Sequence, residues 1–305
     1  MKINQTIEQE SEGNTAVALG FFDGVHLAHQ KIINTTVSYR KTSDLIPTVF
    51  TFKMDSTIPN KRNVKFILSD QSKLEVFERH GVEQVYIPPF SQLSELSSTE
   101  FFYEVLIKKL KAKVIVCGYD YTYGKGATGN TDELMELCIQ NKIELIVMNP
   151  MKADNMIVSS TAIRKGLEAG DIKLVNHLLG ANYFIKGTVS HGNHLGKKLG
   201  FPTANIAFEK NQIVPKFGVY STVVYIGSKI YRGLTNVGVK PTIEGERAPL
   251  AETYIVGLNE DIYGQVVALS FVSMIREEKK FDSIDALKRA MQEDLKYYNI
   301  KEKEY

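Results

Sequence analysis

The feature that most constrains the fold is a regular alternation of short apolar runs and amphipathic stretches over the first 180 residues. The apolar runs are mostly β-branched and apolar on both faces, which is typical of buried parallel strands. This alternation predicts an α/β fold with a doubly wound parallel sheet, whose ligands bind at the carboxyl ends of the strands. The expected strands are Ala16–Gly20, Ile46–Phe52, Gln84–Ile87, Val114–Cys117 and Ile143–Met148, and the expected helices are Leu27–Arg40, Asp70–Arg79, Thr99–Leu110 and Asp132–Gln140. Ser97 and Glu100 have the spacing of a capping box before the third helix.

The pattern changes after Asn182, where apolar runs are joined by loops rich in Gly and Asn. That pattern is typical of a small antiparallel β-barrel. We therefore predict two domains, residues 1–182 and 183–305, which the length of 305 residues also favours. The barrel runs are Tyr183–Val189, Tyr220–Ile226, Thr253–Leu258 and Val266–Met274, with a C-terminal helix over Ser283–Tyr298. Two further helices, from Thr161 and from Asp171, close the first half at Gly180.

The composition excludes several classes of function. With 37 basic and 35 acidic residues the net charge is +2, so no broad surface for nucleic acid or an anionic membrane is expected. The N-terminus is polar and acidic, unlike a signal or transit peptide, and no stretch reaches the ~20 apolar residues of a membrane span. Cys117 and Cys138 are the only cysteines and form no C-x-x-C, which favours a cytoplasmic location.

The segment GFFDGVHLAHQ, residues 20–30, is the first that indicates chemistry. A turn at Asp23 and Gly24 separates the first strand from a helix that opens with His26 and His29, one turn apart on one face. Free N–H groups and the macrodipole attract phosphate to such a helix N-terminus. Two other interpretations stay open: capped or surface histidines, and a zinc site whose remaining ligands the nearby sequence does not offer.

A second segment, VSSTAIRKGLEAGD at residues 158–171, has the same character. Ser159 and Ser160 precede a helix and can cap it, and Arg164 follows on the first turn. With the two histidines this makes a phosphate clamp of imidazoles, a guanidinium, hydroxyls and two helix N-termini. Such a clamp neutralises the charge that builds up when the α-phosphorus of ATP is attacked and pyrophosphate leaves.

A glycine-rich segment, CGYDYTYGKGATG at residues 117–129, contains a formal G-x-G-x-x-G. The dinucleotide interpretation is weak, because the glycines follow the end of their strand by several residues instead of forming the strand–helix turn. A mobile flap is the better hypothesis, in which Lys125 is either a phosphate ligand or a solvated lysine.

In the second domain, the motif GFPTAN ends at Asn205. The preceding GNHLGKK is one residue short of a P-loop and lacks its Ser or Thr. Thr203 offers a hydroxyl and Asn205 an amide to a metal ion or phosphate. The segments GLTNVGVKPT (233–242), AETYI with Glu252, and MIREEKKF (274–281) follow.

The histidine and S-S-T-x-I-R motifs resemble those of the flavin branch of the nucleotidyltransferase fold, and the later array resembles riboflavin kinase. From about residue 15 to residue 298 the chain is similar to the bacterial bifunctional riboflavin kinase/FMN adenylyltransferases, or FAD synthetases. The resemblance implies phosphorylation of riboflavin to FMN with ATP and Mg²⁺, then adenylylation of FMN to FAD with release of pyrophosphate. It implies no nucleic-acid or membrane partner and leaves the oligomeric state open.

The resemblance also implies roles for individual residues, with His26, His29, Arg164 and Glu252 as the catalytic groups. Glu252 is the base that takes the riboflavin hydroxyl proton. In the adenylyltransferase half, the implied ATP-binding residues are Phe22, Asp23, Gly24, His26, His29, Asp120, Ser159, Ser160 and Arg164. In the kinase half they are Gly187, Gly192, Lys197, Thr203 and Asn205, with Mg²⁺ on Thr203 and Asn205 and riboflavin on Asn236 and Arg276.

The chain departs from the family pattern at several positions. Ala28 stands between the histidines where glycine is usual, Lys197 and Lys240 replace arginine, and Tyr254 replaces histidine. Swapping Arg for Lys removes a bidentate phosphate fork. Two rival hypotheses follow: a chain with only one working activity, and a non-enzymatic flavin sensor. The sensor predicts loss of phosphate-binding residues, whereas those residues are present.

Overall fold

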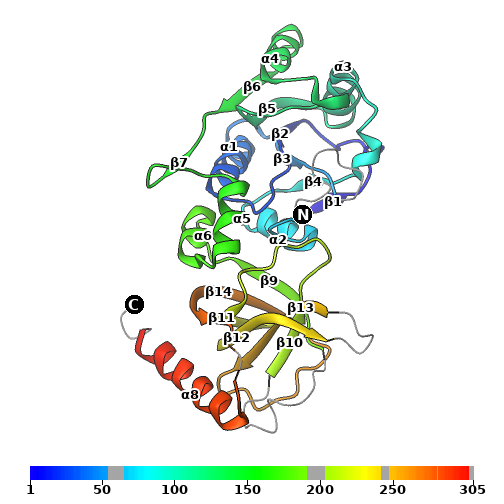
Figure 1. Cartoon of the computed structure of the whole chain (residues 1–305). Helices are drawn as coiled ribbons and strands as arrows, with labels where there is room; N and C mark the ends of the chain where they lie inside the picture. Colours follow the sequence, from blue (N-terminus) through cyan, green and yellow to red (C-terminus); the bar gives the residue numbers. More distant parts are fainter. Residues whose placement is uncertain (54–64, 191–202, 242–246, 280, 302–305) are drawn as a thin grey trace. The chain divides into compact units, whose positions relative to one another are not determined.

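The computed structural model describes residues 1–53, 65–190, 203–241, 247–279 and 281–301 (Figure 1). The chain divides into two compact units, Met1–Ser160 and Thr161–Tyr305. Helices α5 (Ser160–Ala169) and α6 (Ile172–Leu179) therefore lie almost entirely in the second unit.

The first unit is built on a parallel sheet with the strand order β1-β4-β3-β2-β5-β6. Strands β3 and β4 lie to one side of β2, and strands β5 and β6 lie to the other. The order in which strands are added across the sheet therefore reverses, and the crossing point is between β2 and β5. This is the switch point of a doubly wound sheet, as the sequence predicts. The strands are β1 (Lys2–Asn4), β2 (Thr15–Leu19), β3 (Ile46–Phe50), β4 (Gln84–Tyr86), β5 (Ala112–Gly118) and β6 (Glu144–Met148).

The helices of this unit agree with the predicted ranges, with one difference in type. The expected helix over Thr99–Leu110 is a short α-helical turn, α3 (Ser98–Glu100), that continues as the π-helix η2 (Phe101–Lys109). Its capping box is present: the hydroxyl of Ser97 accepts from Glu100 N, and the Glu100 carboxylate accepts from Ser97 N. The remaining elements are α1 (Leu27–Ser43), α2 (Asp70–Arg79), α4 (Thr131–Gln140), the 3₁₀ turns η1 (Phe90–Gln92) and η3 (Lys125–Ala127), and the hairpin β7 (Lys152–Ala153) and β8 (Met156–Ile157).

The second unit contains an antiparallel, nearly closed barrel with the strand order β10-β13-β12-β11-β14-β9. A bridge between Ser190 and Asn205 brings its two edges together. Gly187 lies where these edges approach, and a Cβ there would be 2.9 Å from the Ile206 side chain. The elements are β9 (Phe184–Thr188), β10 (Thr203–Ala207), β11 (Gly218–Ile226), β12 (Lys229–Pro241), β13 (Arg247–Ile255), β14 (Val266–Glu277) and the C-terminal helix α8 (Ile284–Lys301).

Helix α6 packs against β14 of the barrel. The side chain of Asn176 on α6 donates to the carbonyl of Phe271 at 2.9 Å and accepts from the backbone N–H of Tyr183 at 2.8 Å. The helix ends at Gly180, whose φ of 69° is left-handed, and the sequence predicts the end of the helix at this residue. Hydrogen bonds as well as apolar packing therefore fix α6 to the barrel.

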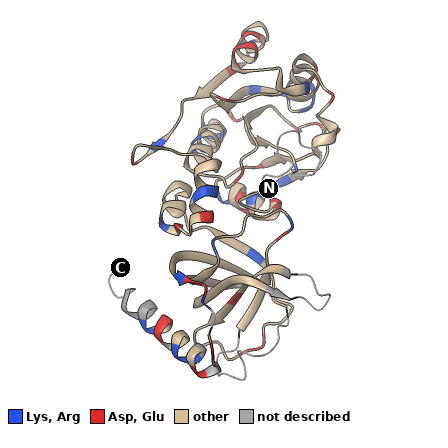
Figure 2. Ribbon diagram, in the orientation of Figure 1, with Lys and Arg blue, Asp and Glu red and all other residues tan. Residues whose placement is uncertain are grey.

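Basic and acidic side chains are interspersed on both units (Figure 2). Both cysteines are buried free thiols. Burial raises the pKa of Cys117 to about 12 and that of Cys138 to about 11, so neither is a thiolate nucleophile near neutral pH. In the part of the chain that the structure describes, no helix has the length and apolar character of a membrane span.

Candidate active sites

The turn between β2 and α1 shapes the first candidate site. Phe22 and Val25 have φ values of 54° and 43°, and Gly24 has a φ of 82°. A Cβ at Gly24 would lie 3.0 Å from the Ile67 side chain. The backbone here is left-handed at three of four successive residues, which is costly for residues other than glycine. Strain of this kind is concentrated at functional sites, where the surrounding structure holds it.

The histidine pair lies directly after this turn. His26 is the N-cap of α1, and its Nδ1 accepts a hydrogen bond of 3.4 Å from the backbone N–H of His29. The two imidazoles stack with centroids 3.6 Å apart, and the ring of Phe22 meets His29 edge-on at 5.2 Å. The sequence left open that these histidines cap the helix, and His26 does cap α1. Because Nδ1 accepts, a neutral His26 carries its proton on Nε2.

Asp23 is buried and holds the turn together. Its carboxylate accepts from the backbone N–H of Ile67 at 2.8 Å, and its carbonyl accepts from the hydroxyl of Ser160 at 2.9 Å. Ser160 begins α5, so this bond ties the start of the second predicted motif to the histidine turn. Ser159 directly precedes α5, and Arg164 follows Ser160 by one helical turn, on the same face of the helix.

The glycine-rich segment after β5 is a closed loop. Two backbone hydrogen bonds join Tyr123 to Gly129, and a Cβ at Gly124 would lie 2.6 Å from the backbone N of Ser98. The mobile flap expected from the sequence is thus a loop packed against the start of α3, because its glycines permit close backbone approach. Lys125 pairs with the carboxylate of Glu95 at 2.7 Å, and both side chains are exposed.

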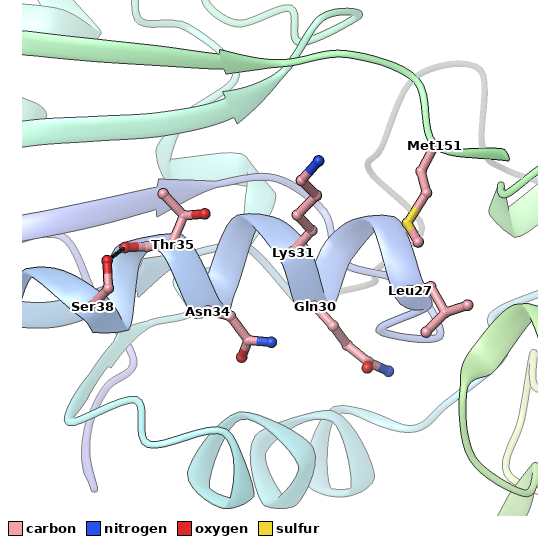
Figure 3. Close-up of a pocket in the computed structure, with 7 residues that line it drawn as sticks. All are labelled: Leu27, Gln30, Lys31, Asn34, Thr35, Ser38 and Met151. Atoms are coloured by element: carbon pink, nitrogen blue, oxygen red, sulfur yellow. Dashed lines mark hydrogen bonds between the residues drawn. The ribbon is translucent and has the colours of Figure 1, made fainter.

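Asp120 is exposed in the turn directly after β5, at the carboxyl edge of the sheet. Figure 3 shows a pocket along α1, lined by Leu27, Gln30, Lys31, Asn34, Thr35, Ser38 and Met151. None of these lining residues belongs to the predicted site.

The second candidate site is a row of side chains across the barrel. Glu252 on β13 lies directly opposite Asn205 on β10 and directly opposite Asn236 on β12. Directly opposed residues of antiparallel strands share one face of the sheet, so these three side chains are neighbours. The hydroxyl of Thr203 donates to the Glu252 carboxylate at 2.8 Å. The register thus gathers four predicted residues that lie up to 49 positions apart in the sequence.

The oxygen atoms of this row fit a hard divalent cation. Asn205 is 3% exposed, and its Oδ1 is buried without a hydrogen-bond partner. Thr203 gives its only hydroxyl proton to Glu252, which leaves its oxygen lone pairs available. Such a cation prefers oxygen ligands and completes its shell with waters and substrate phosphates. Among the described residues no group of three or more His, Cys, Asp or Glu side chains could hold a metal ion.

The remaining predicted kinase residues lie outside this row of the barrel, make other contacts, or fall outside the described residues. Gly187 lies on β9 at the closure of the barrel, next to Ile206 of β10. Gly192 and Lys197 lie outside the described residues. Arg276 on β14 forms a bidentate ion pair with Asp294 on α8, at 2.9 Å from Nε and 2.8 Å from Nη2. Asp294 belongs to none of the motifs that the sequence indicates.

Comparison with known proteins identifies the family of the chain. The FAD synthetase family model matches residues 8–162, and the riboflavin kinase model matches residues 179–300. The bifunctional riboflavin kinase/FMN adenylyltransferase of Bacillus subtilis is 33% identical, over 94% of this chain and 92% of its own length. The chain belongs to the bifunctional riboflavin kinase/FMN adenylyltransferase family. The Listeria monocytogenes protein of the same name is 31% identical, over 95% of this chain and 93% of its own.

A solved structure has the same fold in both units. The crystal structure titled macrolide-efflux protein, from Streptococcus pneumoniae, superposes with a TM-score of 0.83 and 31% identity, covering 96% of this chain and 97% of that chain. The two family models assign an ATP-dependent riboflavin kinase and an FMN adenylyltransferase to this chain, so riboflavin, FMN, FAD and ATP are its substrates and products. Enzymes of these classes use ATP with a divalent metal ion.

Proposed function

We propose that the two activities belong to separate sites: FMN is adenylylated at the histidine turn of the first unit, and riboflavin is phosphorylated at the row of side chains on the barrel. The observation that carries the proposal is the hydrogen bond from Thr203 to Glu252, with Asn205 directly opposite that carboxylate. A carboxylate beside two oxygen donors for a metal ion is what phosphoryl transfer to a hydroxyl requires.

In the kinase step, Glu252 accepts the proton of the ribityl 5′-hydroxyl as this oxygen attacks the γ-phosphorus of ATP, whose bond to the β-phosphate oxygen breaks so that ADP leaves. Thr203 and Asn205 would hold the cation, which we propose to be Mg²⁺ and which would neutralise phosphate charge. The hydrogen bond to Thr203 orients the Glu252 carboxylate before substrate arrives. In the proposal Gly187, Gly192 and Lys197 contribute to the ATP site, and Asn236 contacts riboflavin.

In the adenylylation step the phosphate of FMN is the nucleophile and is already ionised, so no general base is required. Catalysis then consists of positioning and of neutralising charge on the phosphates of ATP. His26 and His29 at the N-terminus of α1 are the donors that we assign to this role. The turn residues Phe22, Asp23 and Gly24 shape the site, and Asp120, Ser159, Ser160 and Arg164 complete it through the motifs they occupy.

A product assay tests the division. Purified protein is incubated with ATP and either riboflavin or FMN, with and without Mg²⁺, and the flavins are separated by chromatography. We expect FMN and FAD from riboflavin, FAD from supplied FMN, and neither product after chelation of the metal. FAD from FMN with no FMN from riboflavin would contradict the kinase assignment, and the reverse would contradict the adenylyltransferase assignment. We further propose a cytoplasmic location, which the two buried free thiols support.

A further inference from the structure

Arg276 lies in the same row of the barrel as the kinase residues. A row of successive directly opposed residues crosses five neighbouring strands: Asn205, Glu252, Asn236, Val219 and Arg276. Neighbouring strands are roughly 4.8 Å apart, so Arg276 is three spacings from Glu252, a path of roughly 14 Å along the curved sheet. Arg276 is therefore too distant for the reacting oxygen and belongs to the far end of the face.

The guanidinium of Arg276 is already committed on three sides. Nε and Nη2 donate to the two carboxylate oxygens of Asp294, and Nη1 donates to the carbonyl of Glu277 at 3.2 Å. The ring of Phe281 lies 5.6 Å from the guanidinium carbon. The side chains of Arg276 and Asp294 are 20% and 7% exposed, so the pair is largely desolvated. Removing one partner of such a pair strands a buried charge, which is strongly destabilising locally.

The chain just after Arg276 returns to the candidate site. A Cβ at Gly238 would lie 2.6 Å from a carboxylate oxygen of Glu278 and 3.3 Å from the amide nitrogen of Asn236. The side chains of Glu278 and Asn236 therefore both lie beside Gly238 of β12, in space that a larger side chain at this position would fill. The segment that Arg276 anchors thus forms a wall beside Asn236.

The direction in which riboflavin extends follows from the phosphate donor. Thr203 and Asn205, which would hold the cation and the ATP phosphates in the proposed kinase site, lie on the β10 side of Glu252. Since the attacking and leaving oxygens are in line, the remainder of riboflavin extends to the opposite side, over Asn236 toward β14. The wall held by Arg276 lies on that side.

We propose that Arg276 is a positioning residue that acts through Asp294: the ion pair clamps α8 and the Glu278 segment into a wall of the riboflavin site. The proposal rests on the kinase assignment above. It replaces the direct contact between Arg276 and riboflavin that the sequence predicts. The clamp sets the affinity for riboflavin, whereas the chemistry at Glu252 is left unchanged.

The test measures kcat and KM of the kinase step in the full-length protein. Asp294→Asn, which keeps the shape of the side chain, should raise KM for riboflavin about tenfold or more, and so should Arg276→Ala. For both variants kcat and KM for ATP should change by less than about twofold, because the clamp is remote from the phosphates. The exchange Arg276→Asp with Asp294→Arg should recover most of the lost affinity. As a matched control, Lys216→Ala removes an exposed ion pair with Glu277 on the same strand and should leave KM unchanged.

Two results would overturn the proposal. In the first, Arg276→Ala raises KM for riboflavin whereas Asp294→Asn leaves it unchanged. Arg276 would then bind riboflavin itself. The other is an equal loss of kcat and of affinity that the charge exchange does not recover. Thermal unfolding followed by circular dichroism reports folding in each variant, and if Arg276→Ala fails to fold, Asp294→Asn alone decides. Absence of kinase activity in the unmodified protein would instead refute the kinase assignment.

Discussion

The imidazole rings of His26 and His29 stack nearly parallel, with an interplanar angle of 15° and centroids 3.6 Å apart. His26 is fixed by its role as N-cap of α1, whereas His29 is held by the stack and by the edge of Phe22. The two histidines therefore differ in what their removal costs: His26 contributes to the start of the helix, and His29 does not cap it. His29 is the better probe of the chemistry.

Replacing His29 with Ala should lower the rate of FAD formation from supplied FMN roughly 10²-fold or more, the scale for losing one preorganised donor. FMN formation from riboflavin should barely change, because the proposed kinase residues are on the other unit. His80→Ala is the control, since His80 bonds Asn34 at 2.9 Å and lies outside the proposed site. A parallel fall of both rates would mean that the two-site assignment is wrong or that the fold has been damaged.

Ala28 separates the two histidines on the first turn of α1 and tests a departure from the family pattern. If its methyl group crowds ATP, Ala28→Gly should lower KM for ATP in the adenylylation step. Glycine in the first turn should at the same time cost up to about 1 kcal/mol of stability. Steady-state kinetics and a melting curve measure the two effects. An unchanged KM would mean that the backbone has adapted to alanine.

The closed loop after β5 gives a matched pair of glycines. Gly124→Ala would place a methyl group against the backbone of Ser98, whereas Gly126, also left-handed with a φ of 66°, has its nearest neighbour at 4.0 Å. Gly124→Ala should therefore destabilise the protein by about 2 kcal/mol more than Gly126→Ala. Chemical denaturation measures the difference. Equal losses would mean that the loop is not packed on α3 and is closer to the mobile flap.

The fold of the first unit could be predicted because its central strands are apolar on both faces. Strand β1 was missed, since it lies in a polar segment in which only Asn4 is buried. The longest barrel strand, β12, was also missed, because its sequence KIYRGLTNVGVKP lacks a clear alternation and contains two glycines. Local pattern does not reveal a strand whose partners supply its stability.

The sequence suggests individual residues of the kinase site but not how they lie relative to one another. Nothing in the sequence places Glu252 between Asn205 and Asn236, because strand register comes from the closed barrel. The clamp on Arg276 was missed entirely. A signal for it existed: Asp294 follows Met291 by three residues on the apolar face of the last helix, where a carboxylate needs a cationic partner.

The packing of α6 on β14 predicts how the kinase unit behaves in isolation. Fragments 161–305 and 182–305 both contain Thr203, Asn205 and Glu252 and should phosphorylate riboflavin. The shorter fragment lacks the bonds of Asn176 and the apolar face of α6, so its melting temperature should be lower by roughly 5 °C or more. Thermal unfolding followed by circular dichroism measures this. A folded but inert 161–305 fragment would mean that the kinase site needs residues from the first unit.

The most direct test of the account is the rate of each step in the Glu252→Gln variant. The amide is nearly isosteric with the carboxylate and can still accept the hydrogen bond from Thr203, but it is no proton acceptor. We predict that FMN formation from riboflavin falls by roughly 10²-fold or more, that KM for riboflavin and ATP changes little, and that FAD formation from supplied FMN is unaffected. FMN production at the unmodified rate would remove Glu252 from the mechanism and contradict the assignment of the kinase site.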